Sequence, residues 1–168
     1  MAERCEDSVT ADNWRWHTQP VPPGPSVIFD LDGVLSDAAT RQHFVEGGRR
    51  DWDAFFEACA DDAVIEEVAR LLELLDPALP IVVLTGRPLR VGPQTLSWLE
   101  RYGLRWDLLI MRDVGDYEAA RRFKRRSVDE LRALGLRPVL AFEDDRRNVE
   151  MFRDAGVPCV YIHSGYYD

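Results

Sequence analysis

Three short polar clusters in this sequence could do chemistry, and each directly follows an apolar run. They are Asp30-Leu31-Asp32-Gly33, Thr85-Gly86-Arg87 and Glu143-Asp144-Asp145. If the apolar runs are parallel strands of one sheet, the clusters lie beyond the same edge. Carboxylates that lie this close repel one another unless a cation sits among them. Magnesium suits a site with one or two carboxylates and a phosphate.

Phosphoryl transfer needs the functional groups that such an edge would hold. It requires an in-line nucleophile, a proton donor for the leaving oxygen and positive charge around the equatorial oxygens. A carboxylate nucleophile would form an aspartyl-phosphate, which water then hydrolyses. The clusters therefore indicate a magnesium-dependent site for phosphoryl transfer.

The choice of basic residues singles out one more candidate. Of the 21 basic residues, only Lys124 is a lysine, and the other 20 are arginines. A compact ammonium group cannot be exchanged for a planar guanidinium group in a tight site. We therefore expect Lys124 to be catalytic, and the alternative is a solvated side chain on a charged helix.

The elements that must position these residues alternate along the chain. Alternation of apolar strands with amphipathic helices predicts a three-layer, Rossmann-like α/β fold with a parallel central sheet. We expect Asp61 or Asp62 to cap the second helix. Strands are predicted at residues 26–29, 80–84, 108–111, 138–142 and 159–162. Helices are predicted at residues 52–59, 62–75, 116–134 and 147–155, and a further helix follows the second strand and ends at residue 102.

The sequence predicts that residues 1–25 form an N-terminal extension that ends in a proline-rich linker. Residues 26–168 are predicted to form the main domain. Trp14 and Trp16 of the extension could dock on the domain or on a partner. Three scattered cysteines indicate reduced thiols, and no apolar stretch approaches the ~20 residues of a membrane span. We expect a cytoplasmic protein without a membrane partner, and the oligomeric state stays open.

Four segments resemble the motifs of the haloacid dehalogenase (HAD) superfamily. Phe29-Asp30-Leu31-Asp32-Gly33-Val34-Leu35 resembles the first motif, residues 82–87 the second, Lys124 the third and residues 141–145 the fourth. The resemblance implies the HAD fold over residues 26–163. Because the segments where cap domains usually sit are short, we expect a minimal cap or none.

The resemblance implies catalytic roles for four residues. Asp30 would attack phosphorus, and Asp32 would protonate the leaving oxygen and later activate water. Thr85 would bind a phosphoryl oxygen, and Lys124 would neutralise the negative charge. The alternatives are an Asx-turn for the two aspartates and a helix cap for Thr85.

The resemblance also implies a magnesium site. Asp30, Asp144 and the backbone carbonyl of Asp32 would bind the ion, and Asp145 would act through water or through another ligand. The alternative for Asp144 and Asp145 is a cap on the following helix.

A closer resemblance is to the phosphatase domain of bacteriophage polynucleotide kinase, which removes 3′-phosphates from nucleic-acid ends. It rests on Gly115-Asp116, on residues 143–152 and on Ser164-Gly165-Tyr166. It implies that Arg41, Gly86 and Arg87 bind the substrate. The phage domain is acidic where this chain has Ala120 and Arg121, which leaves Lys124 without an evident orienting carboxylate.

We therefore expect a polynucleotide 3′-phosphatase that acts on a phosphorylated nucleic-acid end or a nucleotide. The sequence holds no kinase phosphate loop, so we expect no kinase activity in this chain. A partner polypeptide could supply it, and a separate kinase or ligase is the partner we consider. Alternatives are a nucleotide, small-metabolite or phosphoprotein phosphatase, and a non-catalytic binding subunit. The net charge of −9 excludes nucleic-acid binding through the overall field. The arginines around Lys124 form either a local binding patch or a solvated helix face.

Overall fold

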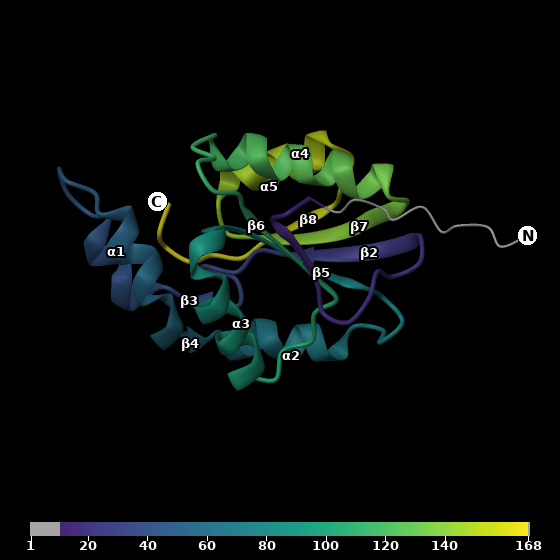
Figure 1. Cartoon of the computed structure of the whole chain (residues 1–168), viewed down its shortest axis with the longest axis horizontal. Coiled ribbons are helices and arrows are strands. Elements are labelled where there is room, and N and C mark those ends of the chain that lie inside the picture. Colours follow the sequence, from purple (N-terminus) through teal and green to yellow (C-terminus); the bar gives the residue numbers. More distant parts are fainter. Residues whose placement is uncertain (1–10, 168) are drawn as a thin grey trace, which may run out of the picture.

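In this computed structural model the described residues, 11–167, form a six-stranded sheet with helices on both faces (Figure 1). The strand order is β1-β6-β5-β2-β7-β8, and all neighbours from β6 to β8 pair in parallel. The inner strands are apolar along most of their length because both faces of the sheet are covered. The strands of this sheet are β1 (Trp14–Trp16), β2 (Gly24–Phe29), β5 (Ile81–Pro88), β6 (Leu108–Arg112), β7 (Leu136–Glu143) and β8 (Cys159–Tyr161).

Helices α4 and α5 cover one face of the sheet, and α2 and α3 cover the other (Figure 1). Phe123 and Phe152 pack in the core on the first face, and Leu72 and Trp98 pack in the core on the second. This arrangement confirms the predicted three-layer α/β fold. The helices are α1 (Trp52–Glu57), α2 (Glu66–Leu74), α3 (Gly92–Arg101), α4 (Ala120–Ala133) and α5 (Arg146–Asp154), with 3-10 helices η1 (Ala39–Phe44), η2 (Ala58–Asp61) and η3 (Leu89–Val91).

The N-terminal extension adds a strand to the sheet. β1 pairs antiparallel with β6, and Trp14 lies opposite Ile110. The Trp14 side chain is buried in the core beneath α4 and α5. The Asn13 side chain donates a hydrogen bond to the carbonyl oxygen of Met111 at 2.7 Å. Of the two alternatives for the extension, this segment docks on the domain itself.

A short insert between β2 and α2 takes the place of a large cap. It contains β3 (Ser36–Asp37) and β4 (Ala63–Val64), which pair antiparallel, together with η1, α1 and η2. Since the insert directly follows β2, it lies at the carboxyl edge of the sheet, at the left of Figure 1. The expectation of a minimal cap is confirmed.

Two helices begin later than predicted. α2 begins at Glu66 with Ile65 at its N-cap, so neither Asp61 nor Asp62 caps it. The Asp62 side chain is instead buried among arginines. α4 begins at Ala120 rather than at residue 116, because the acidic residues before it lie in a loop that binds Arg126 of the helix.

The described cysteines, Cys59 and Cys159, are free and buried, whereas Cys5 lies outside the described residues. Burial raises the pKa of both thiols, which favours the unreactive protonated form. Within residues 11–167, no helix has the length and apolar character needed to cross a membrane.

Candidate active site

The carboxyl ends of β2, β5 and β7 bring together the three polar clusters, as the sequence predicted. Asp30 directly follows β2, and Glu143 is the last residue of β7, which pairs with β2. Residues 85–87 lie in β5, where its pairing with β6 shifts register. The irregular pairing frees this part of β5 to present side chains at the edge of the sheet.

Lys124 lies between two buried carboxylates. Its Nζ is 2.8 Å from Asp30 Oδ1 and 2.6 Å from Glu143 Oε2. Burial opposes the ammonium charge, but the charges of Asp30 and Glu143 raise the pKa of Lys124. Burial, with the charge of Glu143, raises the pKa of Asp30 to about 8, although Lys124 lowers it. A solvated Lys124 is therefore excluded.

Glu143 is a residue whose role the sequence did not reveal. Its Oε1 accepts the backbone N–H groups of Asp144 and Asp145, at 3.0 and 3.1 Å, while Oε2 binds Lys124. This carboxylate therefore orients the lysine and fixes the turn after β7. Its position directly before Asp144 was a signal, but an acidic triplet does not tell which carboxylate binds the lysine.

Asp144 is the residue that best fits a metal ligand. It is buried, and within the described chain neither carboxylate oxygen makes a hydrogen bond of normal geometry, although Ser164 lies close enough to lower the pKa of Asp144. Burial and the charges of Asp30 and Glu143 raise the pKa of Asp144 to about 9. One oxygen from each of these three carboxylates lies within 4.8 Å of the others. An unpartnered buried carboxylate in such a group fits a hard divalent cation such as magnesium.

Gly33 allows the loop after β2 to approach this acidic group. Its φ is +81°, in the left-handed region, and a Cβ atom here would overlap the Asp144 carboxylate. Glycine is therefore required both by the backbone conformation and by the space available.

Asp145 has a different environment from Asp144. It is the N-cap of α5 and accepts the backbone N–H of Arg147 at 2.9 Å, and the Arg147 guanidinium binds both of its oxygens. The predicted cap is therefore present at Asp145. A magnesium role for Asp145 remains a prediction and would have to be indirect.

Thr85 is buried, and its hydroxyl accepts the backbone N–H of Arg87 at 3.2 Å. It does not cap a helix, because the next helical turn is preceded by Pro88. Beside Thr85, Gly86 leaves room for the guanidinium group of Arg112, a residue that the sequence analysis did not single out. The Nη2 atom of Arg112 would lie 3.8 Å from a Cβ atom at Gly86.

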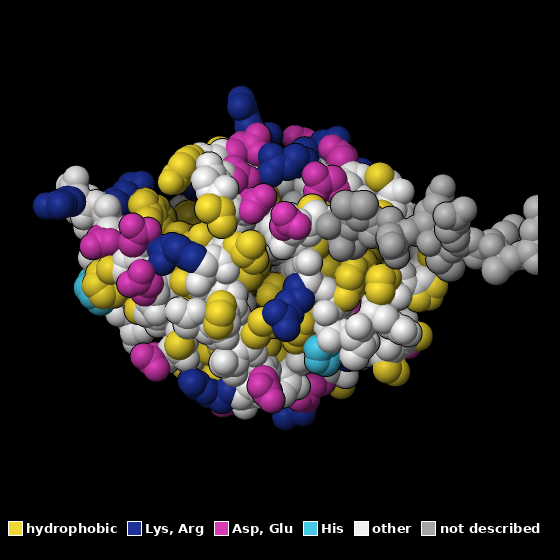
Figure 2. Space-filling view, in the orientation of Figure 1, with side chains coloured by type: hydrophobic (Ala, Val, Ile, Leu, Met, Phe, Trp, Pro, Cys, Tyr) yellow, Lys and Arg dark blue, Asp and Glu magenta, His cyan; other side chains and the backbone are white. Residues whose placement is uncertain are grey.

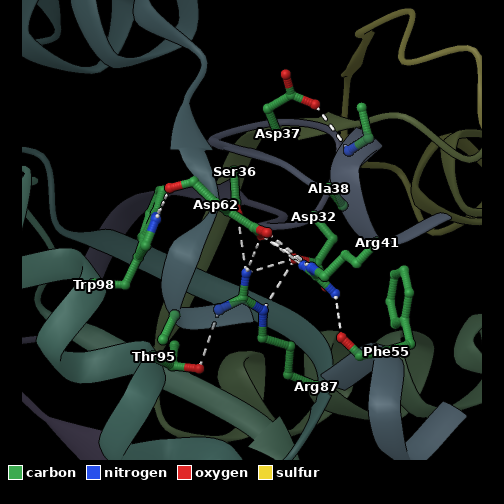
Figure 3. Close-up of polar contacts among 12 residues, drawn as sticks. Asp32, Ser36, Asp37, Ala38, Arg41, Phe55, Asp62, Arg87, Thr95 and Trp98 are labelled. Carbon is green, nitrogen blue, oxygen red and sulfur yellow. Dashed lines mark hydrogen bonds and ion pairs between the residues drawn. The ribbon is translucent and has the colours of Figure 1, made fainter. Parts of the chain in front are cut away.

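Arg41 and Arg87, the predicted substrate-binding arginines, are buried and bind Asp32 (Figure 3). Asp32 Oδ1 lies 2.5 Å from Nη2 of Arg41 and 2.6 Å from Nη2 of Arg87. Both arginines also bind Asp62. Burial opposes ionisation of Asp32, but the charges of Arg87 and Arg41 lower its pKa. The structure thus places these arginines around the predicted proton donor.

The arginines of α4 are largely paired with carboxylates. Arg126 binds Asp116 and Glu118 at 2.9 and 2.5 Å, and it lies 3.8 Å from Glu130. Arg125 pairs with Asp129 at 3.2 Å. Figure 2 shows basic and acidic side chains intermingled over this part of the surface. These contacts favour the solvated helix face over a basic patch.

Comparisons with known proteins agree with this geometry. A family model described as the polynucleotide kinase PNKP phosphatase domain matches residues 24–167. A chain in the structure of the Pnkp1/Rnl/Hen1 RNA repair complex is 25% identical, with a TM-score of 0.70 over 94% of this chain and 47% of that one. This chain therefore spans about half the length of that relative. The comparison with curated proteins gave no match.

Two further structures share the fold at lower identity. A HAD-like phosphatase from Mesorhizobium loti is 17% identical, with a TM-score of 0.59 over 86% of this chain and 75% of that one. A haloacid dehalogenase-like hydrolase from Streptococcus pneumoniae is 13% identical, with a TM-score of 0.54 over 81% of this chain and 83% of that one. The family match covers nearly all of the described residues and agrees with the four motifs. The chain therefore belongs to the polynucleotide kinase phosphatase domain family, within the HAD superfamily.

Proposed function

We propose that this protein is a magnesium-dependent polynucleotide 3′-phosphatase that acts through an aspartyl-phosphate on Asp30. The observation that carries the proposal is the buried contact of Asp30 with Lys124 beside the unpartnered carboxylate of Asp144. This arrangement places Asp30 next to one fixed cation and next to ligands for a second cation, which would lower the raised pKa of Asp30 and keep it ionised. Such positioning and charge stabilisation account for most of phosphoryl-transfer catalysis.

The proposed reaction has two steps. An oxygen of Asp30 attacks phosphorus, and the bond from phosphorus to the 3′-oxygen breaks. Asp32 transfers a proton to that leaving oxygen. Water then attacks phosphorus, Asp32 takes its proton, and the bond from phosphorus to Asp30 breaks to release phosphate. Lys124 holds Asp30 in place, and Thr85 donates a hydrogen bond to a phosphoryl oxygen.

The proton for the first step arrives with the substrate in this proposal. The two arginines keep Asp32 ionised in the substrate-free protein. A phosphate monoester has its second pKa at about 6 and still carries a proton in part of its population near neutral pH. Lys124 and a bound magnesium ion would lower the pKa of the bound phosphate, and its proton can then pass to Asp32.

Magnesium would be held by Asp30, Asp144 and the backbone carbonyl of Asp32, with Asp145 acting indirectly. When bound, the ion would offset the negative charge of the carboxylates and of the phosphoryl oxygens. The fit rests on the carboxylate oxygens of Asp144, which lack hydrogen-bond partners in the described chain.

A nucleic-acid end is the proposed substrate. The family match and the similarity to a chain of an RNA repair complex support this class. The small insert also leaves the site without a large cap, which favours a polymer over a small metabolite. The Pnkp1/Rnl/Hen1 complex is named for three components, which supports a separate kinase or ligase partner for this protein. Such repair would take place in the cytoplasm.

The test measures phosphate release from a 3′-phosphorylated oligonucleotide, a 5′-phosphorylated one and a 3′-mononucleotide, with and without magnesium. We expect magnesium-dependent release from the 3′ end, lost by at least about 10³-fold in Asp30→Asn. Asp53→Asn, at a side chain that is 85% exposed, serves as the matched control and should match the wild type.

The other outcomes separate the alternatives. Turnover of the mononucleotide alone would move the function to nucleotide metabolism while keeping Asp30. Activity confined to sugar phosphates or phosphopeptides would refute the polynucleotide substrate. No turnover of any phosphomonoester by folded protein would leave the binding-subunit alternative.

A further inference from the structure

Asp62 lies at the centre of a buried charge network beside the active site (Figure 3). Its Oδ2 is 2.7 Å from Nη2 of Arg41 and 3.3 Å from Nη2 of Arg87. Ser36 donates its hydroxyl to the same oxygen at 2.5 Å and accepts Nη2 of Arg87 at 3.0 Å. Asp62 therefore contacts both arginines and the hydroxyl that bridges it to Arg87.

The network pairs two arginines with two carboxylates, so each buried cation has an acidic partner. The guanidinium groups of Arg41 and Arg87 are almost fully buried, and Asp32 and Asp62 are the carboxylates that bind them. Removal of the Asp62 charge would leave two buried cations on one carboxylate. Because uncompensated buried charge is costly, the arginines would then change their positions.

The arginines bind one oxygen of Asp32 and leave the other free of them. Three N–H groups, from Arg41 Nη2, Arg87 Nε and Arg87 Nη2, donate to Oδ1 of Asp32 at 2.5, 3.0 and 2.6 Å. The Asp32 side chain is 19% exposed, so it reaches the open side of the site. With Oδ1 fixed, Oδ2 is the oxygen that can exchange a proton with a leaving group.

Asp62 is itself held through its backbone by residues of α3 and of the turn that follows it. Its backbone carbonyl accepts Trp98 Nε1 at 2.8 Å and the Tyr102 hydroxyl at 3.2 Å. Trp98 is fully buried in α3. The core therefore fixes the position of Asp62, and Asp62 can in turn hold the two arginines in place.

We propose that Asp62 is a positioning residue for the phosphatase reaction. It holds Arg41 and Arg87, and these arginines fix Asp32 so that one oxygen faces the leaving group. The inference rests on the proposed function in one respect, namely that Asp32 protonates the leaving oxygen. It assigns a catalytic purpose to the small insert between β2 and α2, which delivers both Arg41 and Asp62.

The test compares leaving groups that differ in their need for a proton. Asp62→Asn should lower kcat for a 3′-phosphorylated oligonucleotide, whose leaving oxygen is strongly basic, by about 10²-fold. Its KM should change by less than about 3-fold, because the lost interaction acts on the transition state. The same variant should keep kcat/KM for p-nitrophenyl phosphate within about 3-fold of wild type, because this ratio reports the first step and nitrophenolate leaves without a proton.

Two further variants keep the test decisive. Asp61→Asn changes the preceding, exposed carboxylate and should behave as the wild type on both substrates. Ser36→Ala removes only the hydroxyl between Asp62 and Arg87, and it should show the same selective loss at a smaller size, about 5-fold. It replaces Asp62→Asn if that variant fails to fold.

An equal loss of kcat/KM on both leaving groups, or a rise in KM without a fall in kcat, would overturn the positioning role. Phenyl phosphate against p-nitrophenyl phosphate provides a pair that does not depend on the natural substrate. If the oligonucleotide is not hydrolysed but the aryl pair still shows the selective loss, the proposed substrate fails and the role of Asp62 stands. No turnover of any of these phosphates by the wild type would overturn both.

Discussion

At the scale of single residues, the buried carboxylate of Asp144 determines how this protein should respond to magnesium. Its pKa is raised to about 9 in the folded protein, above the unfolded value of about 4. A group of this kind contributes most to stability at low pH, and that contribution is lost as pH rises from about 4 to about 9.

Asp144→Asn should therefore raise the free energy of unfolding of the magnesium-free protein at pH 7.5, by about 1–3 kcal/mol. It should also abolish the stabilisation that we expect magnesium to give the wild type, because one of the proposed ligands is lost. Urea denaturation with and without magnesium measures both effects. A variant that magnesium still stabilises as strongly as wild type would contradict the assignment.

Asp145→Asn is the matched control for this experiment. Asparagine can still cap α5, and the replaced carboxylate is already bound by Arg147. We expect this variant to keep most of the shift that magnesium causes. Complete loss of the shift would instead place Asp145 among the direct ligands.

The sequence alone identified candidate site residues whose type is unusual for their position in the chain. Asp30 follows an apolar run, and Lys124 is the only lysine, so both were visible without a structure. The role of Asp62 could not be predicted from the sequence, because an aspartate before a helical pattern is typical of a helix cap. Its role depends on two arginines that lie 21 and 25 residues away in the chain, and no local pattern encodes such contacts.

At the scale of elements, β1 is the strand of the central sheet that the hydrophobic pattern did not predict. Only three residues form the strand, too few for an alternating pattern to be recognised. The longer buried strands were predicted correctly because short continuous apolar runs between turn residues are typical of strands covered on both faces. The start of α4 was misplaced because acidic residues typical of a first helical turn lie instead in the preceding loop.

Trp14→Ala should destabilise the protein by about 3 kcal/mol, because it empties a buried position between the sheet and α4. Arg15→Ala, at an exposed position of the same strand, should change stability by less than about 0.5 kcal/mol. Both variants should retain the wild-type kcat, because β6 and β5 separate β1 from the strand before Asp30. Urea denaturation tests the first expectation, and a phosphatase assay below the transition tests the last.

At the scale of the whole molecule, the net charge of −9 and the paired arginines of α4 limit electrostatic attraction to nucleic acid. Binding of a single-stranded oligonucleotide should therefore neutralise only about two phosphates. This predicts a slope of about −1.4 when log(kcat/KM) is plotted against the logarithm of the salt concentration. Initial rates with a 3′-phosphorylated oligonucleotide at different KCl concentrations measure this slope. A slope steeper than about −3 would reveal a basic surface that the ion pairs conceal.

The burial of Lys124 also has a practical consequence for probing this protein. It is the only side-chain amine in the sequence, and in the folded state its side chain is 3% exposed and bound to two carboxylates. An amine-directed reagent can therefore label position 124 only when α4 moves away from β7. The rate of labelling at this position, followed by mass spectrometry, would report how often the catalytic centre opens, without any engineered probe.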